Sequence, residues 1–228
     1  MKLPLYMWYE ATHALLGPAR ALAGSTKLFY NNPANPLSHS PFGRGVAAAC
    51  EMFERTTRRY GKPEFGYGRV SVNGVQTDVV EDVLLSKPFC NLLHFRKVNA
   101  GRPVNQPKIL MVAPMSGHYA TLLRGTVETF LPTHDVYITD WIDARTVPLS
   151  GGRFDLDDYI DYLIEIYQFL GKDIVGAGLH TLGVCQPSVP LIAAVARMEA
   201  EHHPLAPASM TLMGGPIDTR RKMGRAHV

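Results

Sequence analysis

One short stretch constrains this chain more than any other, because residues 177–188 carry an apolar strand, a sharp turn and the start of a helix. At the turn the sequence reads Gly183-Val184-Cys185-Gln186-Pro187. Hydrolases that present a nucleophile between a strand and a helix use Gly-x-Ser-x-Gly, because small residues let both elements pack around a strained turn. Here cysteine replaces serine, and proline, which suits the first turn of a helix, replaces the second glycine. The stretch predicts a nucleophile turn at Cys185, although by spacing alone a buried structural cysteine fits equally well.

From residue 69 onward the chain alternates strand-like and helix-like segments. The continuous apolar run at 109–113 is typical of a parallel strand buried on both faces. Asn73-Gly74, between two alternating segments, predicts a tight hairpin. The predicted strands are 70–72, 75–85, 92–98, 109–113, 136–139, 174–182 and 209–213, and the predicted helices are 121–130, 156–170 and 189–201. This order predicts an α/β fold with a mostly parallel, three-layer sheet that binds ligands at the carboxyl ends of its strands.

The N-terminal part of the chain has a helical pattern instead. Apolar side chains recur at helical spacing from Leu3 to Leu28, and Gly17-Pro18 is expected to break this segment into two helices. A proline-rich connector at 31–42 precedes a further helix at 44–60. The predicted organisation is a helical N-terminal region at 1–68, a partial α/β domain at 69–221 and an atypical tail at 222–228.

Composition narrows the classes of function. The 228 residues are 46% hydrophobic and 19% charged, which suits a globular domain. Basic and acidic side chains are interspersed to a formal charge of +3, so no basic stripe predicts a nucleic-acid partner. Cys50, Cys90 and Cys185 lack zinc-site spacing, and their odd number argues against a disulfide framework, which predicts a reducing, cytoplasmic location. The sequence predicts no metal, cofactor, signal peptide or membrane span.

Acyl transfer at the predicted turn needs a thiolate and two backbone N–H donors for the developing oxyanion. The dipole of the following helix favours the thiolate form of a cysteine at this position. The expected donors are the N–H of Gln186, directly after the nucleophile, and the N–H of Ser116, in the loop after strand 109–113. Met115 and His118 in the same loop are candidates for contacting the substrate.

The general base is harder to place in this sequence. When a nucleophile is presented in this way, the acid and the histidine follow it along the chain, and only His202, His203 and His227 follow Cys185. His202 and His203 fall at the far end of the predicted helix, roughly 25 Å from Cys185, where a cation pair at the helix C-terminus explains them better. His227 lies in the terminal tail.

Three further residues are weighed as acid or base. His118 is the histidine nearest to the predicted oxyanion loop, but contact with substrate or solvent explains it better. His180 lies inside a predicted strand, which favours a position in the core. Asp218 is a candidate for the acid, although Gly214-Gly215-Pro216-Ile217-Asp218 is equally typical of a plain turn.

Taken together, the motifs of this chain resemble those of the intracellular polyhydroxybutyrate depolymerases, bacterial enzymes that mobilise stored polyester granules. The resemblance extends from the first residues to about Arg221. It rests on Tyr6-Met7-Trp8-Tyr9-Glu10, Pro33-x-x-Pro36-Leu37-x-x-x-Pro41-Phe42, Ala113-Pro114-Met115-Ser116-Gly117-His118-Tyr119, Thr139-Asp140-Trp141, Gly183-Val184-Cys185-Gln186-Pro187 and Met213-Gly214-Gly215-Pro216-Ile217-Asp218. It implies an α/β-hydrolase-like fold, truncated here after about the sixth strand, with Cys185 as the nucleophile.

The chain departs from this family after Thr219-Arg220-Arg221. The resemblance places the catalytic aspartate and histidine in the carboxyl-terminal part of the family's chains, whereas this sequence ends with the dissimilar residues 222–228. We therefore expect a fragment without its catalytic Asp and His, which is inactive alone because acid–base catalysis contributes about 10²–10⁴-fold. The outer edge of the last strand is expected to be uncovered, which favours aggregation.

Three functions are weighed. The resemblance implies hydrolysis of intracellular poly-3-hydroxybutyrate through a cysteine acyl-enzyme, with the polymer or granule surface as partner. The alternative is an acyltransferase similar to polyhydroxyalkanoate synthases, but those resemble Gly-x-Cys-x-Gly, so Pro187 favours the depolymerase. The third is a non-catalytic granule-surface protein that docks through Leu5, Tyr6, Trp8 and Tyr9, although aromatic residues at helical spacing usually belong to a core.

Overall fold

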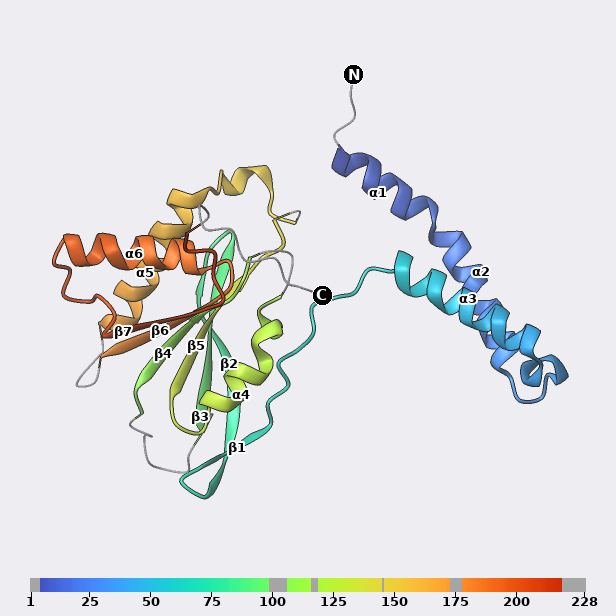
Figure 1. Ribbon diagram of the computed structural model, residues 1–228, viewed down its shortest axis with the longest axis horizontal. Helices are drawn as coiled ribbons and strands as arrows, with labels where there is room; N and C mark the ends of the chain where they lie inside the picture. Colours follow the sequence, from blue (N-terminus) through green and yellow to red (C-terminus); the bar gives the residue numbers. More distant parts are fainter. Residues whose placement is uncertain (1–4, 99–105, 116–118, 145, 173–177, 219–228) are drawn as a thin grey trace. The chain divides into compact units, whose positions relative to one another are not determined.

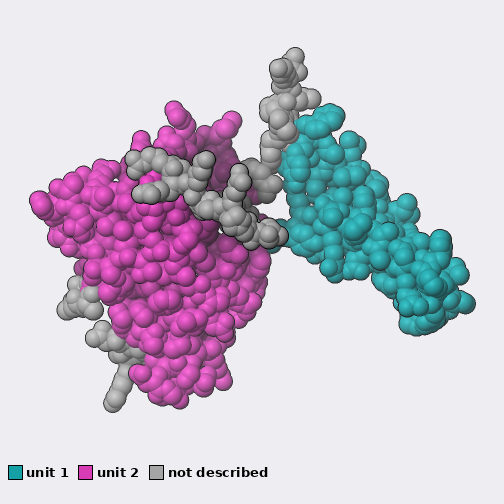
Figure 2. Space-filling model, in the orientation of Figure 1, with its two compact units in different colours: residues 1–61 teal, residues 62–228 magenta. Residues whose placement is uncertain are grey.

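The computed structural model describes residues 5–98, 106–115, 119–144, 146–172 and 178–218. The chain forms two compact units, residues 1–61 and residues 62–228 (Figure 2). The first unit is helical, and the second contains the sheet and the predicted nucleophile (Figure 1).

Helices make up the first unit. They are α1 (Leu5–Leu15), α2 (Gly17–Asn31), the 3-10 turn η1 (Pro36–His39) and α3 (Pro41–Thr57). The predicted break is confirmed, because α1 ends at Leu15 and Pro18 stands in the first turn of α2. Helix α3 begins three residues before the predicted start at 44, since the Ser40 hydroxyl accepts a hydrogen bond from the Gly43 N–H (3.0 Å) and caps the helix.

Small residues allow α2 and α3 to approach each other. Ala23, Gly43 and Ala47 are buried in these helices. A Cβ at Gly43 would lie 3.2 Å from Tyr30 Cδ1 on α2 and 2.0 Å from the Leu37 carbonyl oxygen in η1. Large apolar side chains of this unit are exposed instead, and Trp8 is 66% exposed. The expectation that its aromatic residues are core is therefore wrong for Trp8 and for Tyr9, which is 50% exposed.

A seven-stranded sheet organises the described part of the second unit. Its strands are β1 (Arg69–Val72), β2 (Val75–Ser86), β3 (Cys90–Val98), β4 (Lys108–Val112), β5 (Asp135–Trp141), β6 (Leu179–Val184) and β7 (Ser209–Met213), in the order β1-β2-β3-β5-β4-β6-β7. Pairs β4–β5, β4–β6 and β6–β7 are parallel, whereas β1–β2, β2–β3 and β3–β5 are antiparallel. The predicted α/β-hydrolase-like fold is confirmed. Strand β6, which leads to Cys185, belongs to the parallel part of the sheet.

Two of the three antiparallel pairs follow from short connections. Asn73 (φ 51°) and Gly74 (φ 81°) join β1 to β2, and two successive left-handed residues make the type I′ hairpin turn that this dipeptide predicts. Residues 87–89 alone separate β2 from β3. A parallel pair needs a crossover of a dozen or more residues, so both connections require antiparallel neighbours.

Helices cover both faces of the sheet (Figure 1). Helix α4 (Arg124–Phe130) lies on one face after the 3-10 turn η2 (Ala120–Leu123), and α5 (Leu156–Gly171) and α6 (Ser188–Ala200) pack together on the other. The predicted helix at 121–130 thus begins as a 3-10 turn. The short 3-10 turn η3 (Leu149–Gly151) precedes α5. The core fills the space between the sheet and these helices, and its largest fully buried side chains include Phe95, Met111, Ile138, Leu163 and Leu191.

Strand β6 differs from its prediction at both ends. The pattern predicts a strand over 174–182, whereas β6 runs from Leu179 to Val184. Gly178 precedes it with a φ of 81°, and a Cβ there would lie 2.8 Å from the Ala208 Cβ. Residues 174–177 lie outside the described residues. At its other end β6 extends two residues beyond the predicted end at 182, up to Val184, the residue before Cys185.

Strand β7 forms one edge of the described sheet. It pairs with β6, and all its residues except Leu212 are exposed. The exposed edge agrees with the expectation from the sequence. Aggregation through this edge stays a prediction.

A polar network lies where β5 begins. The Asp135 carboxylate forms hydrogen bonds with His94 Nε2 (2.7 Å) and with the Tyr137 hydroxyl (2.7 Å), and the rings of His94 and Tyr137 stack with centroids 4.4 Å apart. Burial by itself would raise the pKa of Asp135, but these hydrogen bonds and the nearby charge of Lys97 outweigh burial and lower that pKa.

This network predicts pH-dependent stability. Because folding lowers the pKa of Asp135, the charged carboxylate contributes stability above its unfolded pKa of about 3.9, and the contribution is lost as the pH falls through the folded value. Asp135→Asn is expected to lower the free energy of unfolding by about 1–3 kcal/mol at neutral pH, and by less in acid. Urea denaturation of both proteins at neutral pH and in acid measures the difference. An equal loss of unfolding free energy under the two conditions would contradict the role of the charge.

Candidate active site at the end of strand β6

Cys185 occupies the turn between β6 and α6. Its backbone φ is 68°, a left-handed conformation that is rare for residues with a Cβ. Strain of this kind concentrates at functional sites, and the nucleophile turn of the Gly-x-Ser-x-Gly pattern is strained in the same way. The geometry of the described backbone therefore fits the turn that the sequence predicts.

Cys185 differs from the other two cysteines in its surroundings. It is exposed, whereas Cys50 is partly buried and Cys90 is buried. Burial raises the pKa of the Cys90 thiol, which also contacts the Asn91 carbonyl oxygen (3.2 Å). Among the described residues no hydrogen bond or ion pair engages the Cys185 thiol. Of the three thiols, Cys185 is the one open to a substrate.

Backbone hydrogen bonds hold this turn against the next strand. The Cys185 N–H donates to the Met213 carbonyl at the end of β7 (2.8 Å). The Ser188 N–H, at the start of α6, donates to the Cys185 carbonyl (3.1 Å). The position of the thiol therefore depends on β7 as well as on β6 and α6.

Two glycines let the elements around the turn approach closely. A Cβ at Gly183 would lie 2.8 Å from Leu191 Cδ2 on α6. A Cβ at Gly215, in the segment after β7, would lie 1.9 Å from Ser188 Oγ. Pro187 stands in the place of the pattern's second glycine, at the N-cap of α6, one residue before the first turn where the sequence predicts it. The second close approach is thus made through Gly215.

The predicted oxyanion donors are only partly within the described residues. The Gln186 N–H meets no acceptor among them. The Met115 N–H donates to the side-chain Oε1 of Gln186 (3.1 Å), so that N–H is already committed. Ser116 and His118 lie outside the described residues, and their roles stay predictions.

Strand β5 braces the segment that leads into this loop. The Ala113 N–H donates to Thr139 Oγ1 (2.9 Å), and Trp141 Nε1 donates to the Ala113 carbonyl (2.9 Å). Between them Asp140 is buried and forms an ion pair with Lys62. The sequence pattern predicted no role for these braces, and the motif Thr139-Asp140-Trp141 was their signal.

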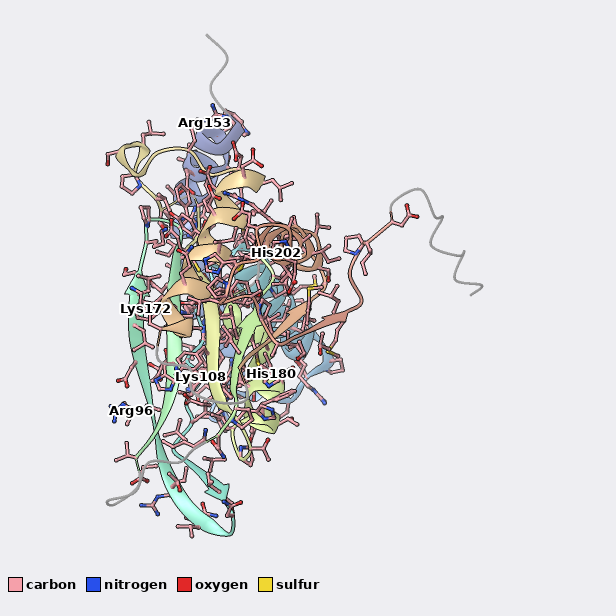
Figure 3. All side chains as sticks on the ribbon, turned by 90° about the vertical axis from the view of Figure 1, so that its left-hand side faces the viewer. Arg96, Lys108, Arg153, Lys172, His180 and His202 are labelled. Atoms are coloured by element: carbon pink, nitrogen blue, oxygen red, sulfur yellow. The ribbon has the colours of Figure 1, made fainter. Side chains whose placement is uncertain are left out.

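No described histidine forms a hydrogen bond with the Cys185 thiol. His180 lies near the start of β6, at the same end of the sheet as Lys108 (Figure 3). Cys185 follows the other end of β6. Its Nδ1 bonds with Ser209 Oγ (2.8 Å). The expectation that His180 is core is wrong, because the side chain is only partly buried at the sheet end.

His202 and His203 close helix α6. His202 has a φ of 50° and its N–H donates to the Glu199 carbonyl (3.0 Å), while the His203 N–H donates to the Met198 carbonyl (2.8 Å). A left-handed residue followed by such hydrogen bonds is a backbone cap of the helix end. Both histidines thus lie at the end of α6 where the sequence places them, and the cation pair stays a prediction. His227 lies outside the described residues.

Asp218 follows β7 in the segment that contains Gly215 and is partly buried. Its role as the acid stays a prediction.

A surface cavity of about 370 Å³ lies elsewhere on the second unit. It is lined by Glu64, Gly66, Tyr67, Val79, Glu81 and Phe95. These residues come from β2, β3 and the segment before β1, not from the elements around Cys185. They include no cysteine, serine or histidine, so the chemistry that the sequence predicts belongs to the turn and not to this cavity.

The described residues limit two other kinds of site. They contain no group of three or more His, Cys, Asp or Glu side chains arranged to hold a metal ion. None of the described helices combines the length and apolar character that crossing a membrane requires.

Comparison with known proteins finds similarity among solved structures alone. Neither a protein-family model nor a curated protein matches this sequence. Among solved structures, a serine-to-alanine variant of an alpha/beta hydrolase enzyme from the metagenome of Lake Arreo, Spain, is 16% identical, with a TM-score of 0.44. The match covers 89% of this chain and 60% of that chain, so this chain spans less than two thirds of that structure. The strand order and the turn at Cys185 define the fold without this similarity.

Proposed function

We propose that this chain attacks a carboxylic ester with the Cys185 thiolate and forms a covalent acyl-enzyme. The observation that carries the proposal is the strained, exposed Cys185 beside the N–H of Gln186, which has no acceptor among the described residues. Attack of sulfur on the ester carbonyl forms a C–S bond and a tetrahedral oxyanion, which the Gln186 N–H binds. The C–O bond then breaks and the leaving alkoxide takes a proton from water. Water then adds to the thioester, the C–S bond breaks, and the free acid and the Cys185 thiolate are released.

The proposed ester is poly-3-hydroxybutyrate. Its support is the set of motifs that resemble the intracellular depolymerases, which implies a cytoplasmic enzyme acting on storage granules. The exposed side chains of Trp8 and Leu22 on α1 and α2 suit an apolar polymer surface. The proposed steps use no cofactor or metal.

Two alternatives differ from this proposal in a measurable way. An acyltransferase of the synthase type would accept the hydroxyacyl group from a hydroxyacyl-CoA and extend the polymer. A granule-surface protein would bind granules without forming an adduct, and the exposed apolar residues of the first unit favour it.

A chromogenic ester separates acylation from turnover. With 4-nitrophenyl 3-hydroxybutyrate, the chain is expected to release about one nitrophenolate per molecule and then to turn over slowly. No described histidine forms a hydrogen bond with the thiol, and the assistance of a positioned base is worth about 10²–10⁴-fold. Stopped-flow absorbance measures the burst, and intact mass spectrometry detects the acyl adduct.

The same assay distinguishes the alternatives. Polymer growth from hydroxyacyl-CoA would favour the acyltransferase, and granule binding with no adduct from any ester would favour the surface protein. Steady turnover after the burst would contradict the slow step and would point to a histidine outside the described residues, His118 or His227.

A further inference from the structure

The side-chain amide of Gln186 joins two segments that are distant in the sequence. Its Oε1 accepts the Met115 N–H at 3.1 Å across 71 residues. Met115 follows the end of β4, and Gln186 follows the nucleophile at the end of β6. Both side chains are partly buried. This hydrogen bond therefore ties the turn at Cys185 directly to the neighbouring parallel strand.

The other backbone groups at Ala113 and Pro114 that can donate are also accounted for. The Ala113 N–H is bound by Thr139 and the Ala113 carbonyl by Trp141, both at 2.9 Å. Pro114 has no N–H to offer. Every backbone N–H from 113 to 115 is thus either absent or bound by a side chain. Beside Cys185, the N–H of Gln186 is left without an acceptor among the described residues.

We propose that the Gln186 side chain is a positioning residue for acyl transfer, which holds the end of β4 at a fixed place beside the thiol. The inference rests on the proposed function and deepens it, because the backbone N–H of Gln186 binds the oxyanion while its side chain sets the opposite wall of the site. Loss of the amide oxygen would free the Met115 N–H and release the segment. A small displacement of a site wall is enough to lower the rate of a positioned reaction.

Two reactions of the same thiol separate positioning from reactivity. Acylation by 4-nitrophenyl 3-hydroxybutyrate passes through an oxyanion, whereas alkylation by iodoacetamide is a direct displacement without one. The ratio of the two rates therefore reports on the oxyanion site and cancels changes in thiolate content or exposure. In Gln186→Met, which keeps the side-chain length and removes the amide, this ratio is expected to fall about 10- to 100-fold with alkylation unchanged.

A matched control applies the same substitution elsewhere. Gln168 lies on α5, and its amide contacts the His203 ring (3.4 Å) at the far end of α6. Gln168→Met is expected to leave the rate ratio as in the wild type. A ratio in Gln186→Met equal to that of Gln168→Met would overturn the inference.

Hydrogen exchange tests the brace without any substrate. The Met115 amide is expected to exchange slowly in the wild type and in Gln168→Met, and at least about tenfold faster in Gln186→Met. Unchanged exchange in Gln186→Met would also overturn the inference. Absence of an acyl adduct in the wild type would instead count against the proposed function, so the two failures are distinguishable.

Discussion

Replacement of Cys185 by alanine is expected to abolish the acyl adduct and the nitrophenolate burst completely. Cys185 is the exposed one of the three cysteines, and its backbone has a left-handed conformation. No other group in the proposed steps can form the covalent intermediate, so a loss below detection is expected rather than a reduced rate. Intact mass spectrometry after incubation with the ester measures the adduct.

Cys50→Ala provides the matched control for this substitution. Cys50 lies on α3 in the other unit and is partly buried. The control should keep the full burst and the adduct. An adduct that persists in Cys185→Ala and disappears in Cys50→Ala would show that Cys50, and not Cys185, is the nucleophile.

Replacement of Gly215 by alanine is expected to destabilise the second unit and displace the turn at Cys185. The added Cβ would lie 1.9 Å from Ser188 Oγ and 3.0 Å from the Cys185 carbonyl oxygen. Ser188 is fully buried at the start of α6, so it has little room to give way. Overpacking of this kind costs about 1–3 kcal/mol, and the rate of acylation should fall with it because the thiol moves.

Gly125→Ala supplies the control for glycine substitution in general. Gly125 is exposed near the start of α4, and nothing lies within 4 Å of an added Cβ there. The change should be neutral or stabilise the chain by up to about 1 kcal/mol, because alanine favours helix. Urea denaturation of both variants measures the contrast, and a Gly215→Ala variant as stable as Gly125→Ala would contradict the close packing around the turn.

The features that the sequence determined by itself depend on a few consecutive residues. Strand 209–213 has the predicted bounds, and Asn73-Gly74 forms the predicted hairpin turn because these residues tolerate positive φ. The turn at Cys185 was also predictable. An apolar run that ends at Gly183-Val184-Cys185 and continues at once as a helix requires a sharp turn between the strand and the helix. In each case the local backbone preference and the apolar period agree with the final structure.

The contacts that complete the candidate site were decided only by the tertiary structure. Met115 and Gln186 are 71 residues apart, and Ala113 and Thr139 are 26 apart. Parallel pairing of β4 with β5 and β6 brings the ends of these strands to one edge, and side chains meet there only after the sheet has formed. The close approach at Gly215 likewise depends on β7 lying beside β6. No local pattern reports such partners, because periodicity describes which face a residue occupies and not which distant residue lies opposite it.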